Sequence, residues 1–220
     1  MSFRTFESCN AKGGCKMVPS MTALILIEYQ NEFTSPGGKL HESVKDTMYS
    51  TDMLNKSLMV VNKARSMGVK VIHAPITFAE DASDNPNKRL GILAGCANDK
   101  LFVQDTWNSD ICDIMKPIDS NDIIIRGKKG LDAFPDTDLE QHLKTHHIET
   151  VVICGFLANC CVESTMRTAC EKGFNVITLT DCTAATTQEG LQASIEGTWN
   201  MFSTPMNASE FLSIARSQPL

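Results

Sequence analysis

The segment from residue 149 to 173, ETVVICGFLANCCVESTMRTACEKG, is the part of the sequence that most constrains the fold. Its apolar run at 151–154 (VVIC) has the length and the β-branched composition of a buried strand. Gly155 ends this run, a helical pattern begins at Cys160, and Gly173 stops it. A buried strand that leads through a short turn into a helix is the repeating unit of a parallel α/β sheet.

The same alternation recurs along most of the chain. Apolar runs predict further strands over 22–27, 69–73, 122–126 and 176–179, and apolar spacing predicts helices over 53–67, 139–146, 160–172 and 188–201. We expect an irregular loop with a short helix over 78–100. The pattern predicts an α/β fold with a mostly parallel sheet and helices on both faces. We expect this single domain to span residues 21–214, after an N-terminal extension over 1–20 that has no clear periodicity.

Composition narrows the class of protein. The chain has 220 residues and a formal net charge of -6, which argues against nucleic acid or an anionic membrane as its main partner. No apolar run approaches the roughly 18 residues of a membrane span, and the N-terminus lacks the apolar core of a secretory signal. The nine cysteines therefore fit reduced thiols in a cytoplasmic protein better than a disulfide framework. Cys9 and Cys15 have no second ligand pair at metal-binding spacing, so we predict no metal there.

Two adjacent cysteines carry the first indication of chemistry. Cys160 and Cys161 lie in the first turn of the helix that follows the 151–154 strand, and Asn159 is the predicted N-cap. A helix N-terminus is electropositive and favours a thiolate over a thiol. The pattern therefore predicts that one of the two cysteines is a nucleophile, without deciding which.

Polar residues follow the other predicted strands. Glu28 comes after the first strand, His73 ends the second, and Lys128 and Lys129 follow the third. In open parallel sheets, ligands bind outside the carboxyl ends of the strands, so we expect these groups to meet the cysteines at one edge. A carboxylate can take the proton of a thiol, and a nearby cation can lower the pKa of that thiol. For His73, a structural role is the alternative to a place in the site.

Three segments in the order LILIEYQNEF, GKKGLDAF and GFLANCCVEST resemble the isochorismatase-like cysteine hydrolases, and the similarity runs over nearly all of 22–206. The resemblance implies that Cys161, directly before VEST, is the nucleophile and that Cys160 occupies a variable position. It implies that Lys128, six positions before Phe134, is the active-site lysine, so that Lys129 is solvated. Glu28 stands where the family usually has Asp.

The resemblance has further structural consequences. It implies a non-proline cis peptide between Phe156 and Leu157, and an oxyanion hole formed by the backbone N–H groups of Leu157 and Cys161. The longer side chain of Glu28 keeps the carboxylate but changes its geometry. Glu32 is the alternative acid, although four residues later it should point into the loop or outward.

Together these features predict a metal-independent hydrolase that cleaves a C–N bond of a small amide, carbamoyl or ureido compound through a thioester on Cys161. The resemblance also implies no cofactor and a homo-oligomer, either a dimer or a tetramer. The Asp-x-His metal set of the nicotinamidase branch is absent, so no metal is predicted. Vinyl-ether hydrolysis is disfavoured, because family members that perform it lack the cysteine.

The alternative is a catalytically silent protein that binds a small ligand or a protein partner. The residues expected to line an apolar substrate pocket, each with a role in the core as the alternative, are Phe33, His73, Trp107 and Phe134.

Overall fold

The computed structural model describes residues 17–118 and 121–216. Its centre is a six-stranded sheet in the order β3-β2-β1-β4-β5-β6, and every neighbouring pair is parallel. The strands are β1 (Thr22–Ile27), β2 (Lys70–Ala74), β3 (Asp122–Ile124), β4 (Thr150–Phe156), β5 (Asn175–Ala184) and β6 (Thr204–Met206). The α/β class with a parallel sheet, expected from the sequence, is therefore confirmed.

The most apolar strand lies in the middle of the sheet. β1 pairs with β2 on one side and with β4 on the other, and all six of its residues are buried. A strand covered on both faces needs apolar side chains in both directions, which explains the continuous run ALILI.

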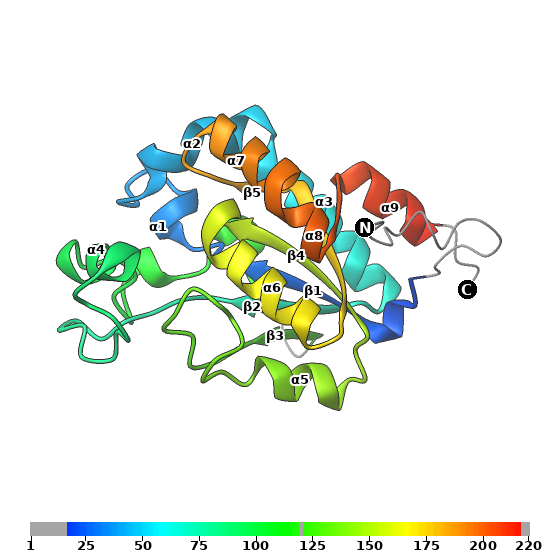
Figure 1. The fold of residues 1–220 in the computed structure, drawn as a ribbon, viewed down its shortest axis with the longest axis horizontal. Coiled ribbons are helices and arrows are strands. Elements are labelled where there is room, and N and C mark those ends of the chain that lie inside the picture. Colours follow the sequence, from blue (N-terminus) through cyan, green and yellow to red (C-terminus); the bar gives the residue numbers. More distant parts are fainter. Residues whose placement is uncertain (1–16, 119–120, 217–220) are drawn as a thin grey trace.

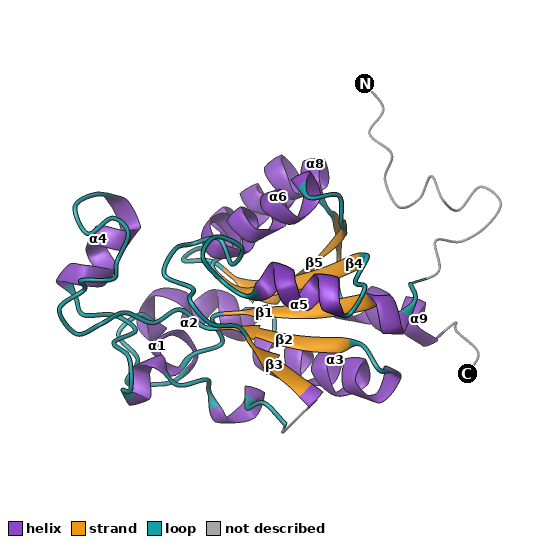
Figure 2. Ribbon diagram, turned by 90° about the horizontal axis from the view of Figure 1, so that it is seen from below, coloured by secondary structure: helices purple, strands orange, loops and turns teal. Residues whose placement is uncertain are grey.

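Helices cover both faces of the sheet, as Figures 1 and 2 show. Leu24 and Leu26 of β1 belong to the core cluster on one face, and Ile25 and Ile27 belong to the cluster on the other face. The first face packs against α2 (His41–Ser50), α3 (Met53–Met67) and α9 (Ala208–Arg216). The second packs against α5 (Leu139–Thr145), α6 (Glu163–Glu171) and α7 (Gln188–Ser194), with α8 (Asn200–Phe202) beside α6.

The segment 77–109, here called the cover segment, lies with α1 (Asn31–Thr34) beyond the carboxyl ends of the strands (Figure 1). It contains the short helix that the sequence predicted in this region, α4 (Gly91–Asn98). None of the helices in the described ranges is both long and apolar enough to cross a membrane.

Several elements differ from the sequence prediction, and for three of them the physical reason is clear. The strand β6 was not predicted, because its sequence TPM contains a proline and is only three residues long; such a strand is tolerated at the sheet edge where it lies. The helix α2 was missed because two of its four buried residues are polar, His41 and Thr47, which weakens the apolar period. β5 is longer than predicted, because a bulge opposite β4 lets its polar second half continue to pair.

The structure describes only the last part of the predicted N-terminal extension. Residues 1–16, including Cys9 and Cys15, lie outside the described residues. Met17 is buried in the core cluster that α3 and α9 line, so this residue of the predicted extension packs onto the domain.

Candidate active site

The structure brings Glu28 and Lys128 into direct contact at the carboxyl edge of the sheet. The ammonium of Lys128 donates to the carboxylate of Glu28, and to the carbonyl oxygen of Gly130 at 2.9 Å. The two charged side chains are 0% and 3% exposed, so each is the counter-ion that makes burial of the other tolerable. Burial alone would lower the pKa of Lys128, but the charge of Glu28 and the neighbouring thiols more than offset this and raise it above its ordinary value of 10.5. The lysine therefore stays charged throughout the neutral pH range.

A turn of the backbone at the end of β1 positions Glu28. Its N–H still pairs with the carbonyl oxygen of Ala74 in β2, at 3.2 Å, but its φ is +55°. Left-handed backbone is uncommon for a residue with a side chain. The strand therefore ends at the residue that meets Lys128.

The loop that carries Lys128 is fixed at both of its ends. Gly127 has a φ of +90°, and a Cβ there would lie 2.3 Å from the carbonyl oxygen of Asp136, so only glycine fits. The N–H of Arg126 donates to a carboxylate oxygen of Asp138 at 2.8 Å. Further along, the N–H of Ala133 donates to a threonine hydroxyl of α6 at 3.0 Å. These contacts set the place of the lysine relative to α5 and α6.

Cys161 lies in a π-helical turn, Ala158–Val162, that leads into α6. Gly155 allows β4 to approach β1 closely, because a Cβ at this residue would lie 2.0 Å from the carbonyl oxygen of Ile27. The predicted cis peptide between Phe156 and Leu157 is present. The turn that holds Cys161 therefore begins directly after β4, and β4 pairs with β1, the strand that Glu28 follows.

The predicted N-cap is wrong. Leu157, and not Asn159, precedes the turn, and no side chain caps it. Instead the carbonyl oxygen of Leu157 accepts hydrogen bonds from the N–H groups of Cys160 at 3.1 Å and Val162 at 3.2 Å. The helical turn starts earlier than the sequence pattern indicated, which leaves Asn159 exposed within it.

The two adjacent thiols differ in their surroundings. Cys161 is buried with 5% exposure, whereas Cys160 is half-buried. A hydrogen bond between the two thiols lowers the pKa of Cys160. The same bond, burial and the charge of Glu28 raise the pKa of Cys161 well above its ordinary 9.0, although Lys128 acts in the opposite direction. Burial and the charge of Glu28 therefore favour the protonated thiol of Cys161, against the effect of Lys128.

The aromatic residues proposed for a substrate pocket lie in three different places. Phe33 is buried and stacks on Phe156, with 4.9 Å between the ring centroids. Phe134 packs in the core cluster of α5 and α6, with its ring centroid 6.3 Å from that of Phe174. Trp107 is 50% exposed and belongs to the cover segment. The structure therefore brings Phe33 close to the turn that holds Cys161, through Phe156, and gives Phe134 a place in the core.

His73 is not brought to Glu28 and Lys128. Its imidazole lies 3.5 Å from a carboxylate oxygen of Asp122, which also pairs with Arg65 of α3. The side chain of His73 is 2% exposed. This arrangement matches the structural alternative considered for the histidine.

Two residues have contacts that sequence reasoning did not anticipate. Lys129 is only partly solvated: its side chain is 27% exposed, and its ammonium contacts Thr77 and Asp84 of the cover segment. Glu32 does point into the loop, but its side chain is fully buried. One of its oxygens accepts from the N–H of Lys39 at 2.7 Å and from the amide of Asn108 at 2.8 Å, and the other accepts from the N–H of Phe102 at 3.0 Å. Glu32 therefore ties the cover segment to the start of α1 and does not compete with Glu28 for the site.

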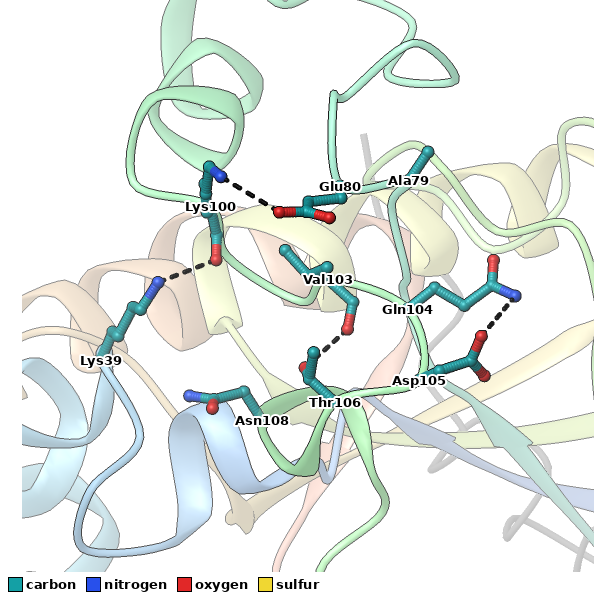
Figure 3. Close-up of a pocket in the computed structure, with 9 residues that line it drawn as sticks. All are labelled: Lys39, Ala79, Glu80, Lys100, Val103, Gln104, Asp105, Thr106 and Asn108. Carbon is teal, nitrogen blue, oxygen red and sulfur yellow. Dashed lines mark hydrogen bonds and ion pairs between the residues drawn. The ribbon is translucent and has the colours of Figure 1, made fainter.

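A cavity of about 580 Å³ lies along the cover segment, and its lining does not include Glu28, Lys128 or Cys161 (Figure 3). Its lining consists of Lys39, Ala79, Glu80, Lys100, Val103, Gln104, Asp105, Thr106 and Asn108. In Figure 3 the ammonium of Lys39 reaches the carbonyl oxygen of Lys100, at 2.9 Å, so this lysine is already engaged in holding the loop. We therefore assign the candidate site to the group around Cys161.

The described part of the chain offers no metal centre. Within residues 17–118 and 121–216, no group of three or more His, Cys, Asp or Glu side chains is arranged to hold a metal ion. The seven cysteines in these ranges are all free thiols.

The comparisons with known proteins agree on one family. The model of the isochorismatase domain matches residues 22–210. A ureidoacrylate amidohydrolase, RutB, of Methylobacterium radiotolerans is 28% identical over 184 residues, which is 79% of this chain and 70% of the relative. The crystal structure of a cysteine hydrolase from Pseudomonas syringae pv. phaseolicola superposes with a TM-score of 0.83 at 23% identity, covering 99% of each chain. An N-carbamoylsarcosine amidase from Thermoplasma acidophilum has a TM-score of 0.68 at 20% identity, covering 85% of this chain and 96% of the other. At these identities the two structures show the shared fold.

Proposed function

Because the chain belongs to the isochorismatase domain family, we propose that it is a hydrolase of carbon–nitrogen bonds in small amide, carbamoyl or ureido compounds, with Cys161 as nucleophile. The observation that carries this proposal is the buried Lys128–Glu28 pair, whose two charges both act on the thiol of Cys161. The amidohydrolase name of the curated relatives supports the class of bond.

The first half of the proposed reaction forms a thioester. Glu28 accepts the thiol proton of Cys161 while Lys128 stabilises the thiolate, and the sulfur attacks the carbonyl carbon of the substrate. The negative charge then moves to the carbonyl oxygen, which the N–H groups of Leu157 and Cys161 stabilise. One such donor contributes roughly 3 kcal/mol in enzymes of this kind. The tetrahedral intermediate collapses when the C–N bond breaks, and Glu28 gives the proton to the leaving nitrogen.

The second half of the reaction restores the enzyme. Glu28, again a carboxylate, removes a proton from water, and the resulting hydroxide attacks the thioester carbonyl. The C–S bond breaks, the acid product leaves, and the proton returns from Glu28 to the sulfur of Cys161. The complete cycle consumes one water molecule for each C–N bond cleaved and needs no oxidant or reductant.

The test combines a substrate screen with detection of the intermediate. Small ureido, carbamoyl and amide compounds are screened for ammonia or amine release, and rapidly quenched samples are analysed by peptide mass spectrometry. We expect an acyl adduct on Cys161 and a loss of activity of about 10³-fold or more in Cys161→Ala. The neighbouring Cys160→Ala is the matched control and should stay within about tenfold of the parent. Full activity of Cys161→Ala would exclude this mechanism.

The same experiment also tests the alternative of a catalytically silent protein. A folded protein that hydrolyses nothing in the screen, and that forms no acyl adduct on Cys161 with any of the compounds, would favour a ligand-binding protein. We retain the homo-oligomer as a prediction, which light scattering of the purified protein would test.

A further inference from the structure

Lys129 makes three polar contacts with the cover segment. Its ammonium donates to the carbonyl oxygen of Thr77 at 2.6 Å, lies 3.3 Å from the hydroxyl of the same residue, and pairs with a carboxylate oxygen of Asp84 at 2.7 Å. The side chains of Lys129 and Asp84 are 27% and 32% exposed. A lysine beside an active-site lysine would ordinarily extend into water, so this arrangement requires a separate explanation.

Asp84 extends the connection into the cover segment. Its second carboxylate oxygen accepts from the N–H of Ala79 at 2.8 Å, so one carboxylate holds both the turn at 79–84 and Lys129. The next residue, Asn85, donates its side-chain amide to the carbonyl oxygen of Leu93 in α4 at 2.9 Å. A continuous path of polar contacts therefore runs from the loop of Lys128 to α4.

The far end of this path, α4, packs into the core cluster that borders the turn of Cys161. Cys96 of α4 is only 7% exposed, and its pKa is raised to about 11, first by burial and then by the charge of Glu28 and the thiol of Cys160. Cys96 belongs to the same core cluster as Phe156 and Leu157, and Cys160 packs against this cluster. In addition, Phe102 of the cover segment packs against Phe33, with ring centroids 5.4 Å apart. The cover segment is thus packed, through Phe33 and Phe156, against the strand end that leads into the turn of Cys161.

From these contacts we propose that Lys129 and Asp84 anchor the cover segment over the catalytic group, so that Lys129 is a positioning residue for substrate binding. This inference rests on the proposed function. It concerns where the substrate is held and not the bond-breaking steps, because other contacts fix Lys128. Gly127 against Asp136, and the hydrogen bond from Arg126 to Asp138, hold that loop without Lys129.

Loss of the anchor should therefore affect binding more than turnover. We expect Lys129→Met and Asp84→Asn to raise KM about fivefold to twentyfold, with kcat within about twofold of the parent. Lys129→Arg retains the charge and should recover most of the loss. The reciprocal variant, Lys129→Asp with Asp84→Lys, should recover part of it.

A second measurement needs no substrate. Alkylation of Cys96 and Cys161 by N-ethylmaleimide is followed by peptide mass spectrometry in the full-length protein. Loosening of the cover segment should raise the rate for Cys96 about tenfold in Lys129→Met, and less in Lys129→Arg. The control is Lys100→Met, which removes the exposed pair with Glu80 in the same segment and should leave the rate unchanged.

The outcomes separate this inference from the proposed function. Equal alkylation rates in the parent, Lys129→Met and Asp84→Asn would overturn the anchor, whatever the substrate screen shows. A failed screen with a raised Cys96 rate would overturn the hydrolase proposal and leave the anchor intact. If Lys129→Met does not fold, Asp84→Asn gives the same test, because it removes the ion pair while keeping the size of the side chain.

Discussion

Replacing Lys128 with methionine tests the buried charge pair most directly. The substitution keeps an unbranched side chain of similar length but removes the ammonium, which leaves the Glu28 carboxylate 3% exposed and without its cation. Removal of one partner from a buried ion pair costs about 3–5 kcal/mol, because the remaining charge is uncompensated. For a domain of this size, that corresponds to a fall in Tm of roughly 6–20 °C. The paired variant Glu28→Gln/Lys128→Met removes both charges and should recover at least about 2 kcal/mol of the loss.

The assay is urea unfolding followed by circular dichroism for the parent, both single variants and the double variant. The free energies of unfolding give the coupling energy of the pair. Since the pKa of Lys128 is raised above 10.5, the lysine's contribution to stability is fully present below that pH and is lost only as pH rises through the higher folded value. The parent pair should thus contribute equally at pH 6 and pH 9. A coupling energy below about 0.5 kcal/mol would show that the two charges do not depend on each other.

Two other predictions follow from local geometry. Gly155→Ala places a Cβ 2.0 Å from the carbonyl oxygen of Ile27 and should destabilise the fold by about 3 kcal/mol or more, whereas Gly95→Ala, with open space around it, should be neutral or slightly stabilising in urea unfolding. Burial would raise the pKa of Asp122, but hydrogen bonds from His73 and Arg65 hold it well below 3.8. This carboxylate therefore stabilises the fold above pH 3.8, and the effect is lost as pH falls through its lower folded pKa. Asp122→Asn should thus flatten the acid limb of the curve of unfolding free energy against pH. An unchanged acid limb would contradict this prediction.

The sheet was predictable because its central strands are buried on both faces. β1 and β4 must be apolar along their whole length, and this produces runs that no amphipathic helix would show. The carboxyl-end rule then placed Glu28 and Lys128 together although they are 100 residues apart. Edge and surface elements lack such a constraint, which is why β6 and α2 were not predicted.

Side-chain partners were harder to predict than elements. The contacts of Lys129 and Glu32 lie in the cover segment, and nothing in the sequence fixes how that segment folds back. The surroundings of Cys161 could not be predicted from the sequence either, because a helix N-terminus is a local feature that contributes about 0.3–1 kcal/mol. Burial and the charge of Glu28 depend on the tertiary fold and outweigh that local effect.

A protonated cysteine beside a buried ion pair has a consequence for the proposed chemistry. At rest the site holds one positive charge on Lys128 and one negative charge on Glu28, so its net charge is zero. Transfer of the thiol proton to Glu28 moves the negative charge from oxygen to sulfur, and Lys128 remains the counter-ion because it interacts with both groups. No net charge is created in a region that excludes water, so the step avoids the cost of burying an unpaired ion. A preformed thiolate next to an ionised Glu28 would instead place two negative charges around one ammonium, which is the less stable arrangement. A thiol that holds its proton at rest is therefore consistent with a reaction that begins with proton transfer to Glu28.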